Sequence, residues 1–131
     1  MRKSGAGKLA GIASIAGFRG LPGATAYSAS KAAAISYLEG LRVEMRPRGV
    51  RVVTVCPGFI ATPMTEKNPY PMPFIIEADD AARRIARVLD SSKSFAVIPW
   101  QMAIVGRLLK LVPIAIFDRM VAGRGYKPPR A

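Results

Sequence analysis

The sequence predicts an α/β protein built on a parallel β-sheet. Short apolar runs rich in β-branched residues alternate with longer segments whose apolar residues recur at helical spacing. A strand–helix–strand–helix–strand order is typical of crossover units on a parallel sheet. Three strands alone leave sheet edges that a complete domain would cover. We therefore expect residues 1–131 to form part of a larger domain.

The three expected strands are Leu9–Ser14, Val50–Val55 and Phe95–Ile98. The second run is apolar apart from Arg51 and Thr54. A continuous apolar run of this length is typical of a strand that is buried on both faces of a parallel sheet. The second strand should therefore lie in the middle of the sheet.

The longest predicted helix covers Ala26–Met45 and ends at Pro47–Gly49, a typical stop signal. A second helix fits Ala78–Leu89, and a third helical segment begins at about Gln101 and breaks near Pro113. Residues 15–25 are rich in glycine and are expected to be a loop. Residues 63–74 contain four prolines and are expected to lack regular structure, and a basic tail contains Pro128 and Pro129.

The charge balance is strongly basic, with 20 Lys and Arg against 8 Asp and Glu and a net charge of +12. Such a balance favours anionic partners, but no nucleic-acid-binding motif accompanies it, so we expect no nucleic acid partner. Charges and Pro113 interrupt the apolar segment Met102–Val121. We expect this segment to pack on the protein or on a second subunit and not to span a membrane.

Histidine is absent from the sequence, and Cys56 is its single cysteine. These counts exclude a Ser-His-Asp or Cys-His catalytic unit and a zinc site within this chain, so we expect no metal. Cys56 cannot form an internal disulfide, and a reducing cytoplasm is the default location. Its position at the end of an apolar run indicates a small buried side chain.

Tyr27 and Lys31 are four residues apart near the start of the longest predicted helix. At this spacing the two side chains lie on one helix face, one turn apart. A phenol is a weak base at neutral pH, but a neighbouring ammonium group stabilises the phenolate. Such a tyrosine can donate a proton to an alkoxide or accept one from an alcohol. A solvated surface pair has the same spacing, so the pattern needs support from elsewhere in the chain.

That support comes from Ser14, which precedes Tyr27 by thirteen residues, and from Pro57-Gly58 and Thr62, which follow the next strand. In this order and spacing, residues 8–100 resemble the short-chain dehydrogenase/reductase family. The resemblance implies the C-terminal half of a Rossmann-like, doubly wound parallel sheet, with three strands and helices on both faces. It also implies NAD or NADP as cofactor and an alcohol or ketone as substrate.

By this resemblance, Tyr27 is the catalytic acid/base, Ser14 polarises the substrate oxygen, and Lys31 stabilises the tyrosinate and holds the nicotinamide ribose. The residues lining the nicotinamide would be Pro57, Gly58, Ile60 and Thr62. The family's glycine-rich turn, which follows the first strand, has no counterpart in the sequence, because the glycines at residues 5–11 precede a strand. Residues 1–131 are therefore expected to be a partial NAD(P)-binding domain without its N-terminal glycine-rich half.

Two further expectations concern partners. Apolar residues in the two loops suggest a lid over a small apolar alcohol or carbonyl substrate; they are Phe18, Leu21, Met64, Tyr70, Met72 and Phe74. Family members commonly pair through the helix that carries the tyrosine, so Ile35, Leu38 and Met45 are expected to face a second subunit of a homo-oligomer. The alternative function is a non-enzymatic remnant that binds a protein partner or an anionic membrane surface through Met102–Val121.

Overall fold

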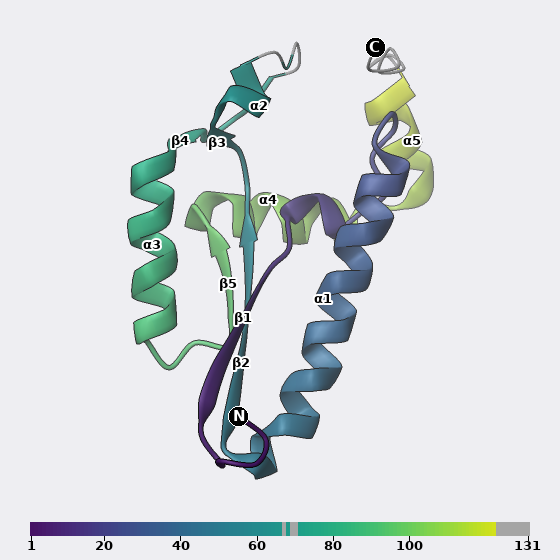
Figure 1. Cartoon of the computed structure of the whole chain (residues 1–131). Coiled ribbons are helices and arrows are strands. Elements are labelled where there is room, and N and C mark those ends of the chain that lie inside the picture. Colours follow the sequence, from purple (N-terminus) through teal and green to yellow (C-terminus); the bar gives the residue numbers. More distant parts are fainter. Residues whose placement is uncertain (67, 69–70, 123–131) are drawn as a thin grey trace.

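Three parallel strands form the central sheet of the computed structural model, which describes residues 1–66, 68 and 71–122 (Figure 1). The strands are β1 (Gly7–Ile12), β2 (Val50–Pro57) and β5 (Phe95–Ile98), in the order β1-β2-β5. Gly7 is in register with Val50 and Thr54 with Phe95. The predicted α/β class with a parallel sheet is therefore confirmed.

Strand β2 is the centre of the fold because its valine-rich sequence suits burial on both faces. Val53 and Val55 are fully buried and pack with Ile98 and with apolar residues of helix α3 (Ala78–Asp90). The one charged residue of the strand, Arg51, donates hydrogen bonds to the carbonyls of Leu89 and Lys93, so its charge lies among backbone acceptors at the end of that helix.

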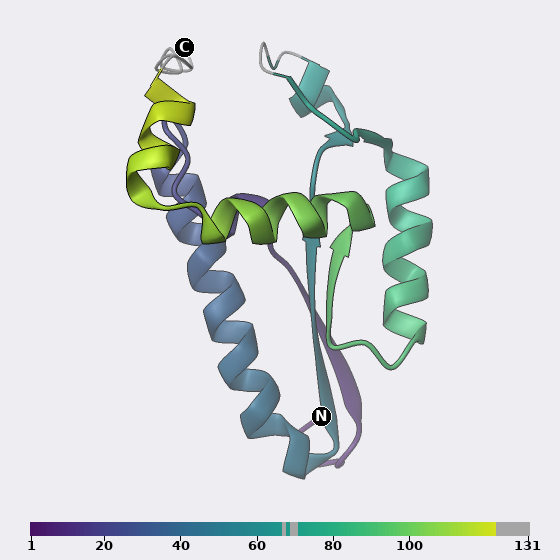
Figure 2. The same cartoon turned by 180° about the vertical axis from the view of Figure 1, so that it is seen from behind.

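Helices cover both faces of the sheet, as predicted. Helix α1 (Thr25–Met45) lies on one side and α3 (Ala78–Asp90) on the other (Figure 1). After β5 the chain forms α4 (Trp100–Leu111) and, beyond the predicted break at Pro113, α5 (Ile114–Ala122). Seen from behind, α4 crosses the β5 side of the sheet (Figure 2).

The prediction that Leu38 faces a second subunit is wrong. Leu38 is buried, and its side chain lies directly over Gly11 of β1, so it fixes α1 to the chain's own sheet. Ile35 and Met45 are half-buried, whereas Tyr37 and Val43 are exposed apolar side chains on this part of the helix. The predicted helix is therefore confirmed, whereas the assignment of Leu38 to a subunit interface is not.

The segment between β2 and α3 contains more regular structure than its prolines suggest. Strands β3 (Ile60–Ala61) and β4 (Ile76–Glu77) pair in parallel, and Pro63–Glu66 form the single-turn helix α2. The prediction of no regular structure over residues 63–74 is therefore wrong at α2. Proline is compatible with the first position of a helix, where the missing N–H has no helical partner.

Two boundaries also differ from the prediction. Strand β1 begins at Gly7 and ends at Ile12, so Ser14 lies beyond the strand, and residues 15–17 form the 3₁₀ turn η1 (Ile15–Gly17). A second 3₁₀ turn, η2 (Arg46–Arg48), follows α1, and Gly49 after it has the positive φ that this ending requires. The basic tail with Pro128 and Pro129 lies outside the described residues.

Within residues 1–66, 68 and 71–122, no single helix is both long enough and apolar enough to cross a bilayer. Helices α4 and α5 satisfy the length and composition requirement only as a pair, and the two are bent by 116° at the break between them.

Candidate active site

Ser14 is held at the carboxyl end of β1 by contacts on both sides. Ala13 N–H donates to the Val55 carbonyl at 2.8 Å, which keeps the chain tied to β2 for one residue beyond the strand. The extended Ser14 then starts η1, and its Oγ accepts a hydrogen bond from Ala16 N–H at 3.1 Å. The serine is buried. Its hydroxyl is therefore fixed in position by the turn that it caps.

Tyr27 and Lys31 occupy adjacent turns at the start of α1, as their spacing predicts. Lys31 Nζ lies 5.6 Å from the centroid of the Tyr27 ring and 3.4 Å from the Ile12 carbonyl oxygen, to which it donates. The second contact connects the lysine to the end of β1, two residues before Ser14. Tyr27 is 52% exposed. The ammonium group thus lies between the tyrosine ring and the strand that leads to the serine.

A close approach of two backbones joins these elements. A Cβ at Gly17 would lie 2.7 Å from the carbonyl carbon of Lys31 and 2.8 Å from the backbone nitrogen of Ala32. Only glycine permits this contact, and it fixes the turn after Ser14 against the helix that carries Lys31. From the sequence, Gly17 is expected only as a loop residue. Its proximity to Ser14 in the sequence was the available signal.

The side chain of Cys56, near the end of β2, lies close to Ser14 and Lys31. It is fully buried, as predicted. Burial raises the pKa of the Cys56 thiol to about 11, while a hydrogen bond from the Ser14 backbone and the charge of Lys31 partly oppose this rise. The two opposing causes show that the end of β2, Ser14 and Lys31 converge. A thiol with this pKa is protonated at neutral pH and is a poor nucleophile.

The predicted nicotinamide-lining residues follow β2 at the same end of the sheet. Pro57 is buried at the end of the strand, and Gly58 N–H donates to the Ile98 carbonyl at 2.7 Å. Ile60 lies in β3. Thr62 N–H donates to Thr65 Oγ1 at 2.9 Å, and the Thr62 carbonyl accepts from Thr65 N–H at 2.9 Å. The Thr65 hydroxyl thereby closes a tight turn in front of α2, a role that the sequence analysis missed.

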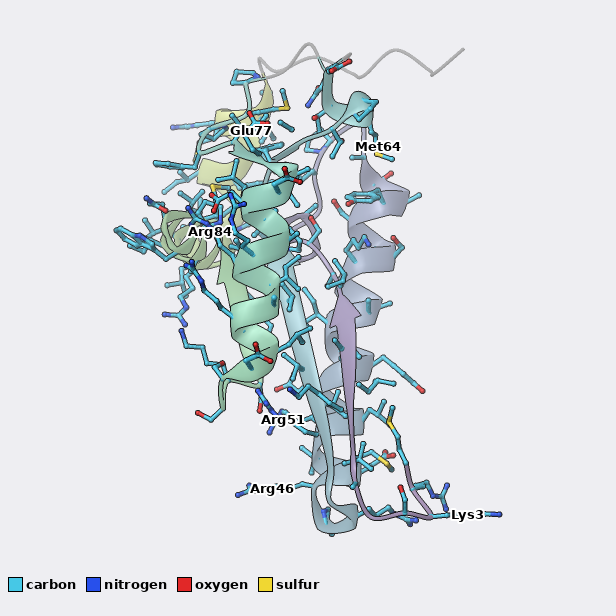
Figure 3. The ribbon with its side chains drawn as sticks, turned by 60° about the vertical axis from the view of Figure 1, so that its left-hand side comes forward. Lys3, Arg46, Arg51, Met64, Glu77 and Arg84 are labelled. Carbon is cyan, nitrogen blue, oxygen red and sulfur yellow. The ribbon has the colours of Figure 1, made fainter. Side chains whose placement is uncertain are left out.

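All of these groups lie at one end of the molecule. Figure 1 shows the start of α1, the carboxyl ends of the strands and α2 at the same end. Figure 3 places Met64 and Glu77 at this end and Lys3 and Arg46 at the opposite one. Ligands of open α/β sheets bind at the carboxyl ends of the strands.

The suggested apolar lid is only partly consistent with the structure. Phe18 stacks on Phe95 of β5, with ring centroids 6.3 Å apart, and lies against Gly106 of α4, so it packs on the chain itself. Met64 and Phe74 are exposed, while Tyr70 lies outside the described residues. Within the part of the chain that the structure describes, no group of three or more His, Cys, Asp or Glu side chains could hold a metal ion.

Comparisons with known proteins agree with this arrangement. The sequence model of the short chain dehydrogenase family matches residues 1–71. An oxidoreductase of Myxococcus xanthus is 43% identical over 112 residues, which are 86% of this chain and 44% of that protein. A cyclopentanol dehydrogenase of Comamonas sp. is 40% identical over 85 residues, which are 65% of this chain and 31% of that protein.

Among solved structures, a short chain dehydrogenase from Burkholderia cenocepacia in complex with NADP superposes with a TM-score of 0.75 at 30% identity. The superposition covers 91% of this chain and 49% of that structure. The chain thus spans about half or less of the length of the relatives it matches. The parallel sheet, and the serine, tyrosine and lysine at the carboxyl ends of its strands, agree with these matches. The chain belongs to the short-chain dehydrogenase/reductase family of oxidoreductases.

Proposed function

We propose that this chain supplies the catalytic residues of an NAD(P)-dependent oxidoreductase that interconverts an alcohol and a ketone. The observation that carries the proposal is the position of the Lys31 ammonium group, 5.6 Å from the Tyr27 ring on one face of α1. A cation beside a phenol favours its ionised form, and a tyrosine that exchanges its proton readily can act as a general acid or base.

Each catalytic side chain has a separate task in this proposal. Tyr27 holds the proton that passes to the substrate oxygen during reduction and accepts it during oxidation. Ser14, fixed as the cap of η1, donates its hydroxyl hydrogen to the same oxygen, where negative charge develops. Lys31 places its positive charge beside the Tyr27 ring.

The donor set at the start of α1 also fits a nicotinamide cofactor. Lysine has three N–H donors, and the contact of Lys31 with the Ile12 carbonyl at 3.4 Å uses one of them. Its other donors and the Tyr27 hydroxyl suit the two hydroxyls of a ribose. Pro57, Gly58, Ile60 and Thr62 are proposed to line the nicotinamide ring. When bound, the cofactor supplies or accepts the hydride, and the Burkholderia cenocepacia relative binds NADP.

The substrate is proposed to be a small apolar alcohol or its ketone. Met64 and Phe74 expose apolar surface in the segment that follows the proposed nicotinamide-lining residues. A matching relative from Comamonas is a cyclopentanol dehydrogenase, whose substrate belongs to this class. Cyclopentanol and cyclopentanone are therefore suitable first substrates for an assay.

The test uses the chain fused to the remaining part of the Myxococcus xanthus relative, with NADH and NADPH consumption as the measurement. Tyr27→Phe should lower kcat by about 10²-fold or more, because it removes only the transferable proton. Tyr37→Phe is the matched control, since it makes the same change at an exposed position of the same helix. Lys31→Met should lower kcat and raise KM for the cofactor. Equal activities of the two tyrosine variants would refute the assignment.

A further inference from the structure

The outward side of α4 carries an exposed apolar stripe. Trp100, Ile104, Leu108 and Leu111 follow one another at spacings of four, four and three residues, and they are 65%, 51%, 59% and 78% exposed. The opposite side of the helix is used in packing, where Met102 and Gly106 are buried. Ile114, Ile116 and Met120 of α5 are exposed as well. An exposed apolar stripe of this kind marks an interaction site.

The stripe lies on the opposite side of the sheet from β1. Among the described residues, β1 and β5 are both edge strands, each with a strand partner on one side only. Helix α4 follows β5 at the other side of the sheet and crosses that side (Figure 2). Strands that paired with β1 would therefore leave the stripe uncovered.

Cations flank the stripe along one side. Arg107 and Lys110 are exposed on α4, and together with Arg42 of α1 they line an open hollow of about 730 Å³. Phe18 and Phe95 contribute apolar walls to this hollow. Glu39 is the one carboxylate among its lining residues, so the hollow is cationic.

This charge pattern distinguishes between possible occupants of the surface. Helix α4 contains two cations and no carboxylate. Two copies of the stripe packed face to face would bring Arg107 and Lys110 of one copy close to the same cations of the other. An anionic lipid surface offers the opposite charge beside an apolar layer, and a chain of net charge +12 is attracted to it as a whole.

We propose that the exposed apolar stripe of α4 docks on an anionic phospholipid surface. The apolar stripe enters the boundary between headgroups and acyl chains, and Arg42, Arg107 and Lys110 bind headgroup phosphates at the rim of the hollow. Neither helix is by itself long and apolar enough to cross the bilayer, and the bend of 116° at their junction suits two short helices lying in the interface. Trp100 at the start of the stripe is of the residue type that favours this depth.

Vesicle flotation with the 131-residue chain tests the proposal. Vesicles of equimolar phosphatidylcholine and phosphatidylglycerol should bind the chain at low salt, and added salt should weaken the binding. Vesicles of phosphatidylcholine alone should bind little. Trp100 is the single tryptophan, so a blue shift of its emission on binding reports directly on this face.

Two pairs of variants locate the contact. Leu108→Asp should abolish binding. Val43→Asp also replaces an exposed apolar side chain by a carboxylate, but on α1, and it should preserve binding. Arg107→Gln with Lys110→Gln should weaken binding by at least about tenfold, given about fivefold for each cation near a lipid surface. Arg83→Gln with Arg87→Gln on α3 should have a smaller effect. The proposal would be overturned if the two variants of either pair lost binding equally, or if neutral vesicles bound the chain as well as anionic ones. It would also be overturned if the chain formed a dimer without lipid and Leu108→Asp dissociated that dimer.

Discussion

Two glycines in the loop after Ser14 differ in their surroundings. Gly17 lies against the backbone of Lys31 and Ala32, whereas a Cβ at Gly20 would meet no atom within 4 Å. Gly17→Ala should therefore lower the free energy of unfolding by about 1–3 kcal/mol, because backbone must move. Gly20→Ala should change it by about 0.5 kcal/mol or less. Urea unfolding of both variants decides this, and equal stabilities would show that the loop absorbs the extra methyl group.

At the same scale, the buried thiol of Cys56 predicts a pH dependence of stability. Its pKa in the folded chain is about 11, against 9.0 for an ordinary cysteine, so the thiol is protonated in both states below pH 9. Above pH 9 the unfolded chain ionises first, and unfolding is favoured. By pH 11 the wild type should lose about 2 kcal/mol more than Cys56→Ala. The measurement is urea unfolding of both proteins under reducing conditions, and parallel pH profiles would contradict the prediction.

At the scale of secondary-structure elements, Arg19 connects the loop after η1 to the last two helices. Its Nη1 donates to the Leu109 carbonyl at 2.8 Å and to the Val112 carbonyl, and its guanidinium carbon lies 4.1 Å from the Phe117 ring centroid. These carbonyls at the end of α4 have no helical partners of their own. One side chain therefore caps α4 and holds α5.

Arg19→Ala should destabilise the α4–α5 region by about 1–3 kcal/mol, through the loss of charge-assisted hydrogen bonds and of the ring contact. Amide hydrogen exchange is the appropriate measurement, with faster exchange expected in α4 and α5 and little change in α3. Arg48→Ala, at an exposed position of η2, is the control. Unchanged protection of α4 would show that its packing on β5 suffices without the arginine.

The elements that could be predicted from sequence are those whose signal is local and long. The valine run of β2 and the helical spacing of α1 and α3 are of this kind. The pairing of β3 with β4 was not accessible, because Ile76 N–H finds its acceptor at Phe59, seventeen residues earlier, across a segment with several prolines. The candidate site could be predicted as a set of residues, because a motif fixes their order. Its supports, Gly17 and the Thr65 hydroxyl, act through tertiary contacts that leave no periodic pattern.

At the scale of the whole molecule, we expect the 131-residue chain by itself to bind NADH and NADPH weakly or not at all. The glycines at residues 5 and 7 lead into β1 rather than following a strand, so they form no pyrophosphate site at a helix N-terminus. Titration with each cofactor, followed by cofactor fluorescence, measures this. Saturable micromolar binding would mean that another part of this chain holds the pyrophosphate.

The position of β2 between two parallel partners has a consequence for the order of folding. Both strand pairs join residues that are about 40 positions apart, so each requires the closure of a long loop before any sheet contact forms. No hairpin can nucleate this sheet, because all of its neighbours are parallel. The two crossover units share β2 and nothing else in the sheet. The packing of α1 or α3 on β2 is then the earliest step whose favourable contacts offset the entropy lost in closing a loop. A sheet of this topology is typical of slower-folding domains.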